Sequence, residues 1–163
     1  MVKIALAMLF VCSGVACTQS VSCTEIGCGD HATIHLRRTD GMTPALATEL
    51  EIDGRRVTCS APMPNGATIQ VCDDTRVHVV HRELTDCTET KSPSSLQLSC
   101  VPNGRFEQTI GVDGVPKKIV VKILENGTVT TQKSFEPNYT TVRPNGDGCE
   151  PTCKQYDETW EIP

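Results

Sequence analysis

The sequence predicts one exported, all-β domain built as a disulfide-linked β-sandwich. Three observations lead to this expectation: an apolar segment at the N-terminus, an even set of cysteines beyond it, and short runs of alternating apolar and polar residues along the rest of the chain. Alternation with a period of two places every second side chain on the same face, which is typical of half-buried strands.

The N-terminal segment has the anatomy of a signal peptide. Lys3 supplies a positive charge, residues 4–11 form an unbroken apolar run, and small residues precede Cys17. A membrane-spanning helix needs about 20 apolar residues, and this run is much shorter. We therefore expect residues 1–16 to be removed on export.

The residue at the expected cleavage point is a cysteine, which opens two alternatives. Ala16-Cys17 resembles the end of a bacterial lipobox, in which the thiol receives a diacylglyceryl group before cleavage; Gly14 departs from the larger aliphatic residue of that pattern. Lipidation would consume Cys17 and leave an even number of cysteines. We expect an anchor at Cys17, a short tether over residues 17–22, and, from Thr18, outer-membrane sorting. The alternative is plain secretion of a soluble protein.

The mature chain has the size of one domain and a modest acidic charge. It retains 147 of the 163 residues, and loss of Lys3 changes the formal charge from −5 to −6. A nucleic-acid partner would require a basic face, so we expect none. Residues 23–163 are expected to form a single sandwich domain, because no linker separates segments of different composition.

Eight cysteines remain for the folded domain and are expected to form four disulfides, since an oxidising compartment stabilises such bonds. Cys59 and Cys72 bracket one short segment, and Cys87 and Cys100 bracket another, which favours a local disulfide within each pair. The other four cysteines lie near the two termini, and we expect them to pair across the termini. Eight cysteines allow 105 connectivities, so the pairing is open. The candidates are Cys23, Cys28, Cys59, Cys72, Cys87, Cys100, Cys149 and Cys153.

Zinc is the competing interpretation of the terminal cysteines. Cys23 and Cys28, and likewise Cys149 and Cys153, have spacings near those of structural zinc pairs. In an oxidising compartment such pairs usually form disulfides, so we expect no metal and no cofactor.

Nine strands and two tight turns are predicted from local patterns. Asp53-Gly54 and Asn126-Gly127 are two-residue hairpin signals. Residues 43–49 contain only a weak indication of a helical turn, and Pro-Asn-Gly at 64, 102 and 144 indicates turns. In residues 96–100, Leu96, Leu98 and Cys100 share one face. The predicted strands are residues 32–37, 50–53, 56–59, 67–71, 77–81, 96–100, 118–124, 128–135 and 156–162; the last is expected to pack Trp160 onto the sandwich.

No pattern of catalytic residues is present. The chain lacks Gly-x-Ser-x-Gly, His-Glu-x-x-His, a glycine-rich phosphate loop and Cys-x-x-Cys. The four histidines, His31, His35, His78 and His81, lie in expected strands without partner motifs, and we expect no ligand or catalytic role for them. The interpretation is that the protein is not an enzyme.

Two cysteine-containing segments resemble a known family. Residues 23–28 (CTEIGC), soon after Cys17, and residues 139–153, with their Arg-Pro-Asn-Gly-Asp-Gly-Cys-Glu-Pro-Thr-Cys ending, are similar to cysteine-rich surface lipoproteins of large-genome social and predatory bacteria. The resemblance implies an immunoglobulin-like or transthyretin-like β-sandwich at the cell surface and implies no reaction.

The functional expectation is a non-catalytic lipoprotein of the cell envelope, displayed on the outer membrane for binding or structural roles. Its expected partners are the membrane, through a lipid on Cys17, and an unknown protein or glycan. The alternative is a secreted disulfide-rich module that binds a ligand or inhibits a protease, because bridged loops are preorganised at low entropic cost.

Overall fold

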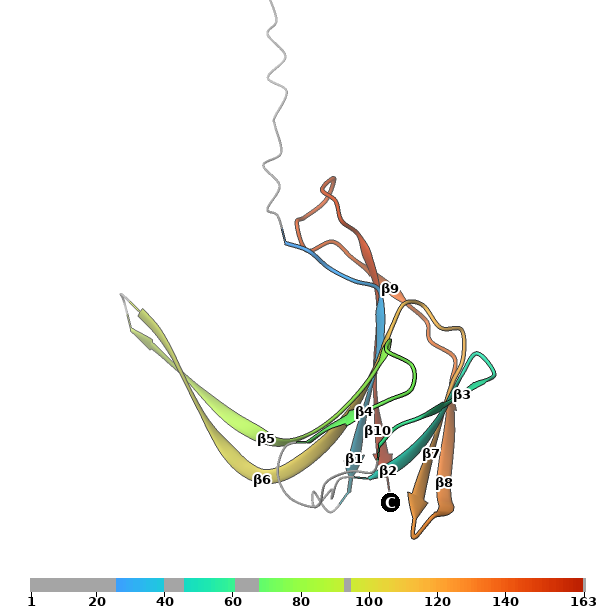
Figure 1. Cartoon of the computed structure of the whole chain (residues 1–163). Helices are drawn as coiled ribbons and strands as arrows, with labels where there is room; N and C mark the ends of the chain where they lie inside the picture. Colours follow the sequence, from blue (N-terminus) through green and yellow to red (C-terminus); the bar gives the residue numbers. More distant parts are fainter. Residues whose placement is uncertain (1–25, 40–45, 61–67, 93–94, 163) are drawn as a thin grey trace, which may run out of the picture.

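A computed structural model describes residues 26–39, 46–60, 68–92 and 95–162 (Figure 1). The expected signal peptide, the tether with Cys17, the candidate disulfide residue Cys23 and the first Pro-Asn-Gly segment lie outside the described residues. The described part of the chain is entirely strands, turns and loops. It therefore offers no helix long and apolar enough to cross a membrane.

The strands form two sheets, which confirms the all-β prediction. In the six-stranded sheet the order is β4-β5-β6-β1-β10-β9, and in the four-stranded sheet it is β3-β2-β7-β8. Neighbours are antiparallel except β1 and β10, which run parallel. The strands are β1 (His31–Arg38), β2 (Ala47–Ile52), β3 (Arg55–Thr58), β4 (Thr68–Val71), β5 (Val77–Ser92), β6 (Ser95–Asp113), β7 (Ile119–Glu125), β8 (Thr128–Phe135), β9 (Thr140–Val142) and β10 (Cys153–Ile162).

The core lies between the two sheets. Alternate residues of each central strand are buried there, as with Ile34 and Leu36 of β1 and Leu50 of β2. Phe135 of β8 and Trp160 of β10 meet edge to face, with ring centroids 6.1 Å apart. The prediction that Trp160 packs onto the sandwich is therefore confirmed.

Both two-residue hairpins form as predicted. Asp53-Gly54 joins β2 to β3, and Asn126-Gly127 joins β7 to β8. The φ angles are 50° and 83° in the first turn and 52° and 78° in the second, so both central residues are left-handed. Asn, Asp and Gly are the residues that tolerate this conformation most readily, which is why a local signal was sufficient.

Two local predictions are wrong. The weak helical turn over residues 43–49 gives way, in its described part, to β2, because Ala47–Ile52 pairs with β7 along its whole length. Pro102-Asn103-Gly104 is not a turn between strands but lies inside β6. It produces a register shift opposite Leu84, so long-range pairing with β5 overrides the local turn chemistry.

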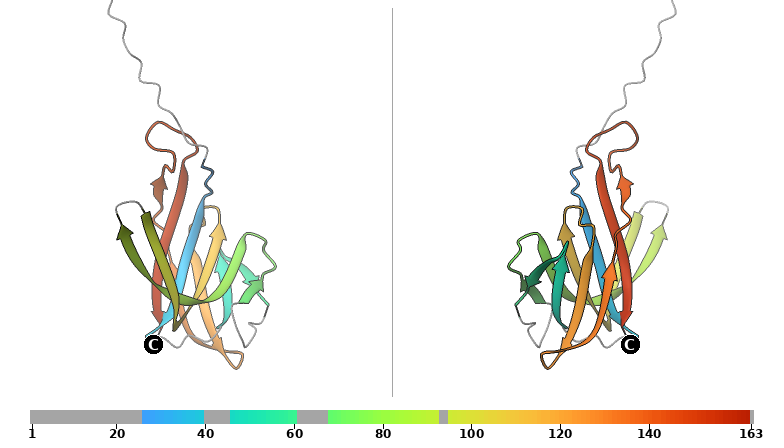
Figure 2. Two further views of the ribbon diagram at one scale, coloured as in Figure 1. Left: turned by 90° about the vertical axis from the view of Figure 1, so that its left-hand side faces the viewer. Right: turned by 90° about the vertical axis from the view of Figure 1, so that its right-hand side faces the viewer.

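The hairpin of β5 and β6 is far longer than the segments predicted for it. Its distal part, which we call the arm, comprises residues 82–92 of β5 and 95–106 of β6. Figures 1 and 2 show these two strands curving away from the body of the protein. Leu96 and Leu98 were expected to share a face of a strand, and they do, but on the arm that face is 65% and 63% exposed at the two leucines.

Candidate functional site

One disulfide joins the edges of the two sheets. Cys59 follows β3 and Cys72 follows β4. The two residues are joined by an S–S bond, and their backbones form an isolated antiparallel β-bridge. The N–H of Ser60 donates to the carbonyl of Val71 at 2.8 Å beside it. The local pair expected from the sequence thus forms, but it links strands of different sheets rather than one hairpin.

A second disulfide fixes the two ends of the chain to each other. Cys28, just before β1, is bonded to Cys153 at the start of β10, 125 positions later in the sequence. Cys149 is also disulfide-bonded. The thiols that a zinc site would use are therefore oxidised at Cys28, Cys149 and Cys153, which removes the basis for the zinc alternative.

The third disulfide lies on the arm. Cys87 of β5 and Cys100 of β6 face each other directly across the hairpin, with Cα atoms 4.0 Å apart. The arm carries exposed large apolar residues on one strand only: Leu96 and Leu98 beyond this bond, and Val101, which is 60% exposed, next to the bond on the side of the body. Since no residue of the two sheets covers them among the described parts, the arm presents its apolar side chains to solvent.

The register shift at the base of the arm is held by side chains. Asn103 donates from Nδ2 to Oδ1 of Asp86 at 2.9 Å, and the N–H of Gly104 donates to Oε1 of Glu83 at 3.0 Å. Gly104 has a φ of 74°, a conformation in which glycine is favoured. The irregular segment is thus fixed by specific hydrogen bonds and is not a loose loop.

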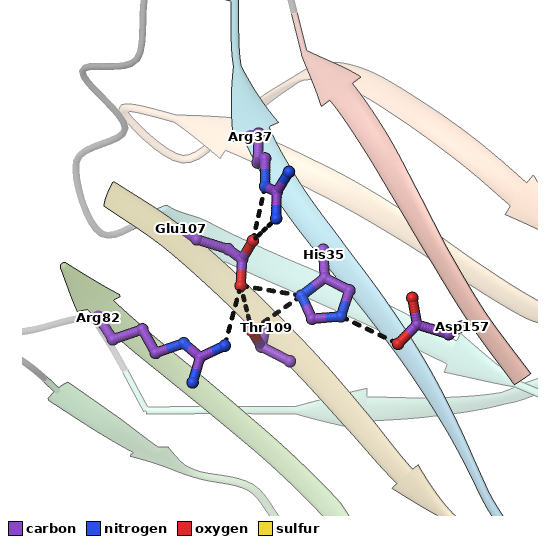
Figure 3. A network of polar contacts seen from close by, with 6 residues as sticks. All are labelled: His35, Arg37, Arg82, Glu107, Thr109 and Asp157. Atoms are coloured by element: carbon purple, nitrogen blue, oxygen red, sulfur yellow. Dashed lines mark hydrogen bonds and ion pairs between the residues drawn. The ribbon is translucent and has the colours of Figure 1, made fainter. Parts of the chain in front are cut away.

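Next to this irregularity lies the largest charged cluster of the described chain, centred on Glu107 (Figure 3). The Glu107 side chain is only 1% exposed although it lies on the face of β6 opposite the core. Arg37 of β1 contacts its Oε2 through both Nε and a terminal nitrogen at 2.6 Å. Arg82 of β5 reaches Oε1 at 3.4 Å.

The same carboxylate also contacts His35. The Nδ1 of His35 lies 2.9 Å from Oε1 of Glu107, and its Nε2 lies 3.1 Å from Asp157 of β10. Thr109 donates its hydroxyl to the same Oε1 at 3.2 Å. The cluster therefore crosses β5, β6, β1 and β10, four consecutive strands of the six-stranded sheet.

Burial by itself would raise the pKa of Glu107. The hydrogen bonds and positive charges of His35 and Arg37 outweigh that effect, so the pKa lies below its ordinary value. Both oxygens of this ionised carboxylate are occupied by donors. A general base needs a free oxygen that can reach a substrate proton, so the cluster is suited to hold strands together rather than to transfer protons.

The remaining histidines of interest have separate surroundings. His78 contacts Asp113 at 3.2 Å on an exposed surface, and His81 stacks on Phe106 with ring centroids 5.3 Å apart. Among the described residues, no group of three or more His, Cys, Asp or Glu side chains is placed to hold a metal ion.

An open depression of about 390 Å³ lies beside Tyr139, between Lys117 and Lys154. The Tyr139 hydroxyl donates to the carbonyl of Pro116 at 2.9 Å. Burial, together with the nearby negative charges of Asp53 and Asp30, raises the pKa of Tyr139 to about 12. The hydroxyl is therefore protonated at neutral pH and already engaged, so it provides no base for a reaction there.

Sequence reasoning missed the Glu107 cluster. His35 and Arg37 were visible as two side chains on one face of a predicted strand. Nothing local indicated that Glu107 is buried, since its cover comes from β1 and β5, far away in the sequence.

No family model, curated protein or solved structure matches this chain.

Proposed function

We propose that the protein is an exported, non-catalytic binding module and that the arm is its interaction element. The observation that carries this proposal is the arm itself: a disulfide-linked hairpin that projects from the body with Leu96, Leu98 and Val101 exposed. Leu96 and Leu98 share one face of the arm, and exposed apolar side chains that lie together on a projecting element are typical of protein contact surfaces.

The construction of the arm supports a binding role energetically. A two-stranded hairpin alone is at best marginally stable in water, because it buries little apolar surface. Here the Cys87–Cys100 bond restricts its unfolded conformations, and the Glu107 cluster holds its base through Arg82. A preorganised arm loses less conformational entropy on binding, which favours affinity.

The contacts of Glu107 and Tyr139 support the proposal that the module is non-catalytic. The oxygens of Glu107 accept from His35, Thr109, Arg37 and Arg82, and Tyr139 is held by Pro116. These contacts serve strand positioning.

The disulfides indicate an oxidising environment outside the cytoplasm. Attachment to the bacterial outer membrane through a lipid on Cys17 remains part of the proposal, supported by the lipobox-like Ala16-Cys17. The finer description of the two sheets as an immunoglobulin-like or transthyretin-like sandwich is likewise proposed, on the resemblance of the cysteine segments.

A photo-crosslinking experiment tests the role of the arm. A benzophenone amino acid is placed at Leu98 on the arm or, as a matched control, at Val129 on β8, which is 45% exposed. Irradiation of intact cells that export the protein should yield a cross-linked adduct from position 98 and little from position 129. Equal yields from the two positions, or none from 98, would contradict the proposal.

The anchor is tested separately by intact mass. A diacyl or triacyl adduct on Cys17 of protein purified from membranes supports the lipoprotein proposal. An unmodified N-terminal thiol would reject the anchor and leave secretion of the soluble domain.

Protease inhibition is the second candidate, since Lys91 near the tip of the arm has a side chain that is 79% exposed. A basic side chain on a bridged, rigid hairpin suits the entrance of a trypsin-like protease. Stoichiometric inhibition that disappears in Lys91→Ala would support it, and rapid cleavage after Lys91 without inhibition would reject it.

A further inference from the structure

We propose that the β6 edge of the arm, residues 95–101, pairs with the same edge of a second copy of this chain. The two strands would run antiparallel and join two arms into one four-stranded ribbon. This inference rests on the proposed function, because it names the partner that the arm binds.

The β6 edge is open along the arm. β1 pairs with β6 only between Gln108 and Asp113, and β5 lies on the other side of β6. Among the described residues, no strand therefore pairs with this edge from Leu96 to Val101, and its outward-facing N–H and C=O groups there are available to another chain. Nearer the body, the N–H groups of Gly104 and Arg105 are already taken by the side chains of Glu83 and Asn103.

The register identifies which backbone groups point outwards. Directly opposed residues in an antiparallel pair alternate between hydrogen-bonded pairs, with Cα atoms about 5.5 Å apart, and non-bonded pairs at about 4.5 Å. Cys87 and Cys100, at 4.0 Å, belong to the second kind. The N–H and C=O groups of Cys100 consequently face away from β5, and by alternation so do those of Leu98 and Leu96.

The two edges of the arm differ in charge. The β5 edge carries Asp86, Glu89 and Lys91, charged side chains of the type that protects edge strands from pairing. Residues 95–101 of β6 contain no charged side chain, and Leu96 and Leu98 are exposed there. Pro102, which has no N–H, marks the end of the open edge.

The open edge is complementary to itself. Antiparallel pairing centred on Leu98 places Leu98 against its counterpart and Leu96 against Cys100 of the second copy. The outward groups of these three residues would then exchange about six hydrogen bonds. Because this segment is uncharged, no like charges are brought together, and the exposed leucines of both copies lie side by side on one face.

The size of the contact predicts a weak dimer. Seven residues of strand extend over roughly 23 Å. A contact of this length lies at the low end of interface sizes, which predicts a dissociation constant in roughly the micromolar range.

Sedimentation equilibrium of the purified, disulfide-bonded protein over a micromolar concentration series tests the proposal. The wild type should show a monomer–dimer equilibrium. Leu98→Pro removes an outward N–H without removing a bond of the hairpin, and Leu98→Lys introduces like charges at the two-fold axis. Each should raise the dissociation constant by at least about tenfold. Thr90→Lys, on β5, is the matched control and should change it less than about twofold.

Two results would overturn the inference: a monomer at every concentration, or a dimer that both Leu98 variants leave intact. Circular dichroism and disulfide mapping check that the variants fold; if Leu98→Pro fails these checks, Leu98→Lys decides. A monomeric protein that still cross-links from position 98 to a different polypeptide refutes self-pairing and leaves the proposed function standing. A dimer without any cross-link from the arm contradicts both the self-pairing of the β6 edge and the proposed binding role of the arm.

Discussion

The side-chain amide of Gln108 on β6 forms hydrogen bonds with both the N–H and the C=O of Leu46, as the backbone of a neighbouring strand would. Its Oε1 accepts from the N–H of Leu46 at 2.7 Å, and its Nε2 donates to the Leu46 carbonyl at 3.1 Å. Gln108 is fully buried, so these bonds fix the entrance of β2 to the other sheet inside the core. Gln70 of β4 donates to the same carbonyl at 3.3 Å.

Replacing Gln108 should therefore cost more than replacing Gln70. Gln108→Leu leaves the buried N–H of Leu46 without its acceptor, at a cost of about 2 kcal/mol in the free energy of unfolding. Gln70→Leu removes a longer bond while Gln108 still serves the carbonyl, so its cost should stay below about 1 kcal/mol. Urea unfolding followed by Trp160 fluorescence measures both. Equal losses would show that the Leu46 N–H is satisfied in another way.

The two local disulfides should contribute differently to stability although both close segments with a sequence separation of 13. A loop of this size predicts about 3 kcal/mol from restriction of the unfolded chain. Cys59–Cys72 joins the edges of the two sheets, so replacing both cysteines by serine should lower global stability by about that amount. Replacing Cys87 and Cys100 should leave the Trp160 transition nearly unchanged.

The second variant should instead loosen the arm. Since the distal arm makes its contacts within its own hairpin, it can open without breaking the core. Hydrogen exchange by mass spectrometry should accelerate in peptides covering residues 85–101 and remain unchanged in β7 and β8. A global loss as large as that of the Cys59 and Cys72 variant would show that the arm and the body unfold together.

The features predicted correctly were those encoded by neighbouring residues. Asn126-Gly127 specified its turn because both positions require a left-handed backbone, and the alternation in β1 specified its buried face. Of the hairpin of β5 and β6, only residues 77–81 and 96–100 were predicted as strands, so most of the arm was missed. Its Thr- and Glu-rich β5 segment has no apolar alternation, and its strand conformation depends on pairing with β6 and on the Cys87–Cys100 bond.

The same physical reason explains why the candidate site could not be predicted. The burial of Glu107 depends on Arg37 and His35, about 70 residues away in the sequence. The strand β9 was missed because three residues provide too little alternation to recognise.

Acid should weaken the Glu107 cluster. Although burial opposes ionisation, the contacts with His35 and Arg37 keep the pKa of Glu107 below its ordinary value. The folded protein therefore binds this proton less readily than the unfolded chain does. The stabilisation is fully present above the unfolded pKa, near 4.3, and is lost as pH falls through the folded pKa.

Glu107→Gln tests this pH dependence. At pH 7 the variant should be about 2 kcal/mol less stable, because it loses hydrogen bonds to a charged acceptor. The difference in the free energy of unfolding between the variant and the wild type should become smaller as pH falls below about 4.3. Glu89→Gln, at the exposed pair with Lys91, is the control and should show little difference at any pH. A gap that stays constant from neutral to acid pH would rule out a contribution from the Glu107 charge.

Gly104→Ala should weaken the arm through its backbone alone. Gly104 has a φ of 74°, and no atom lies within 4 Å of the position that the alanine methyl group would occupy, so the cost is conformational and not steric crowding. About 1 kcal/mol is expected, which corresponds to roughly fivefold faster exchange if the arm opens as a unit. Gly29→Ala, where the space is equally open and φ is not positive, should be nearly neutral. If Gly104→Ala changes hydrogen exchange in the arm peptides no more than Gly29→Ala does, the irregularity in β6 does not hold the arm. In that case the direction of the arm must be fixed by the contact between Arg82 and Glu107.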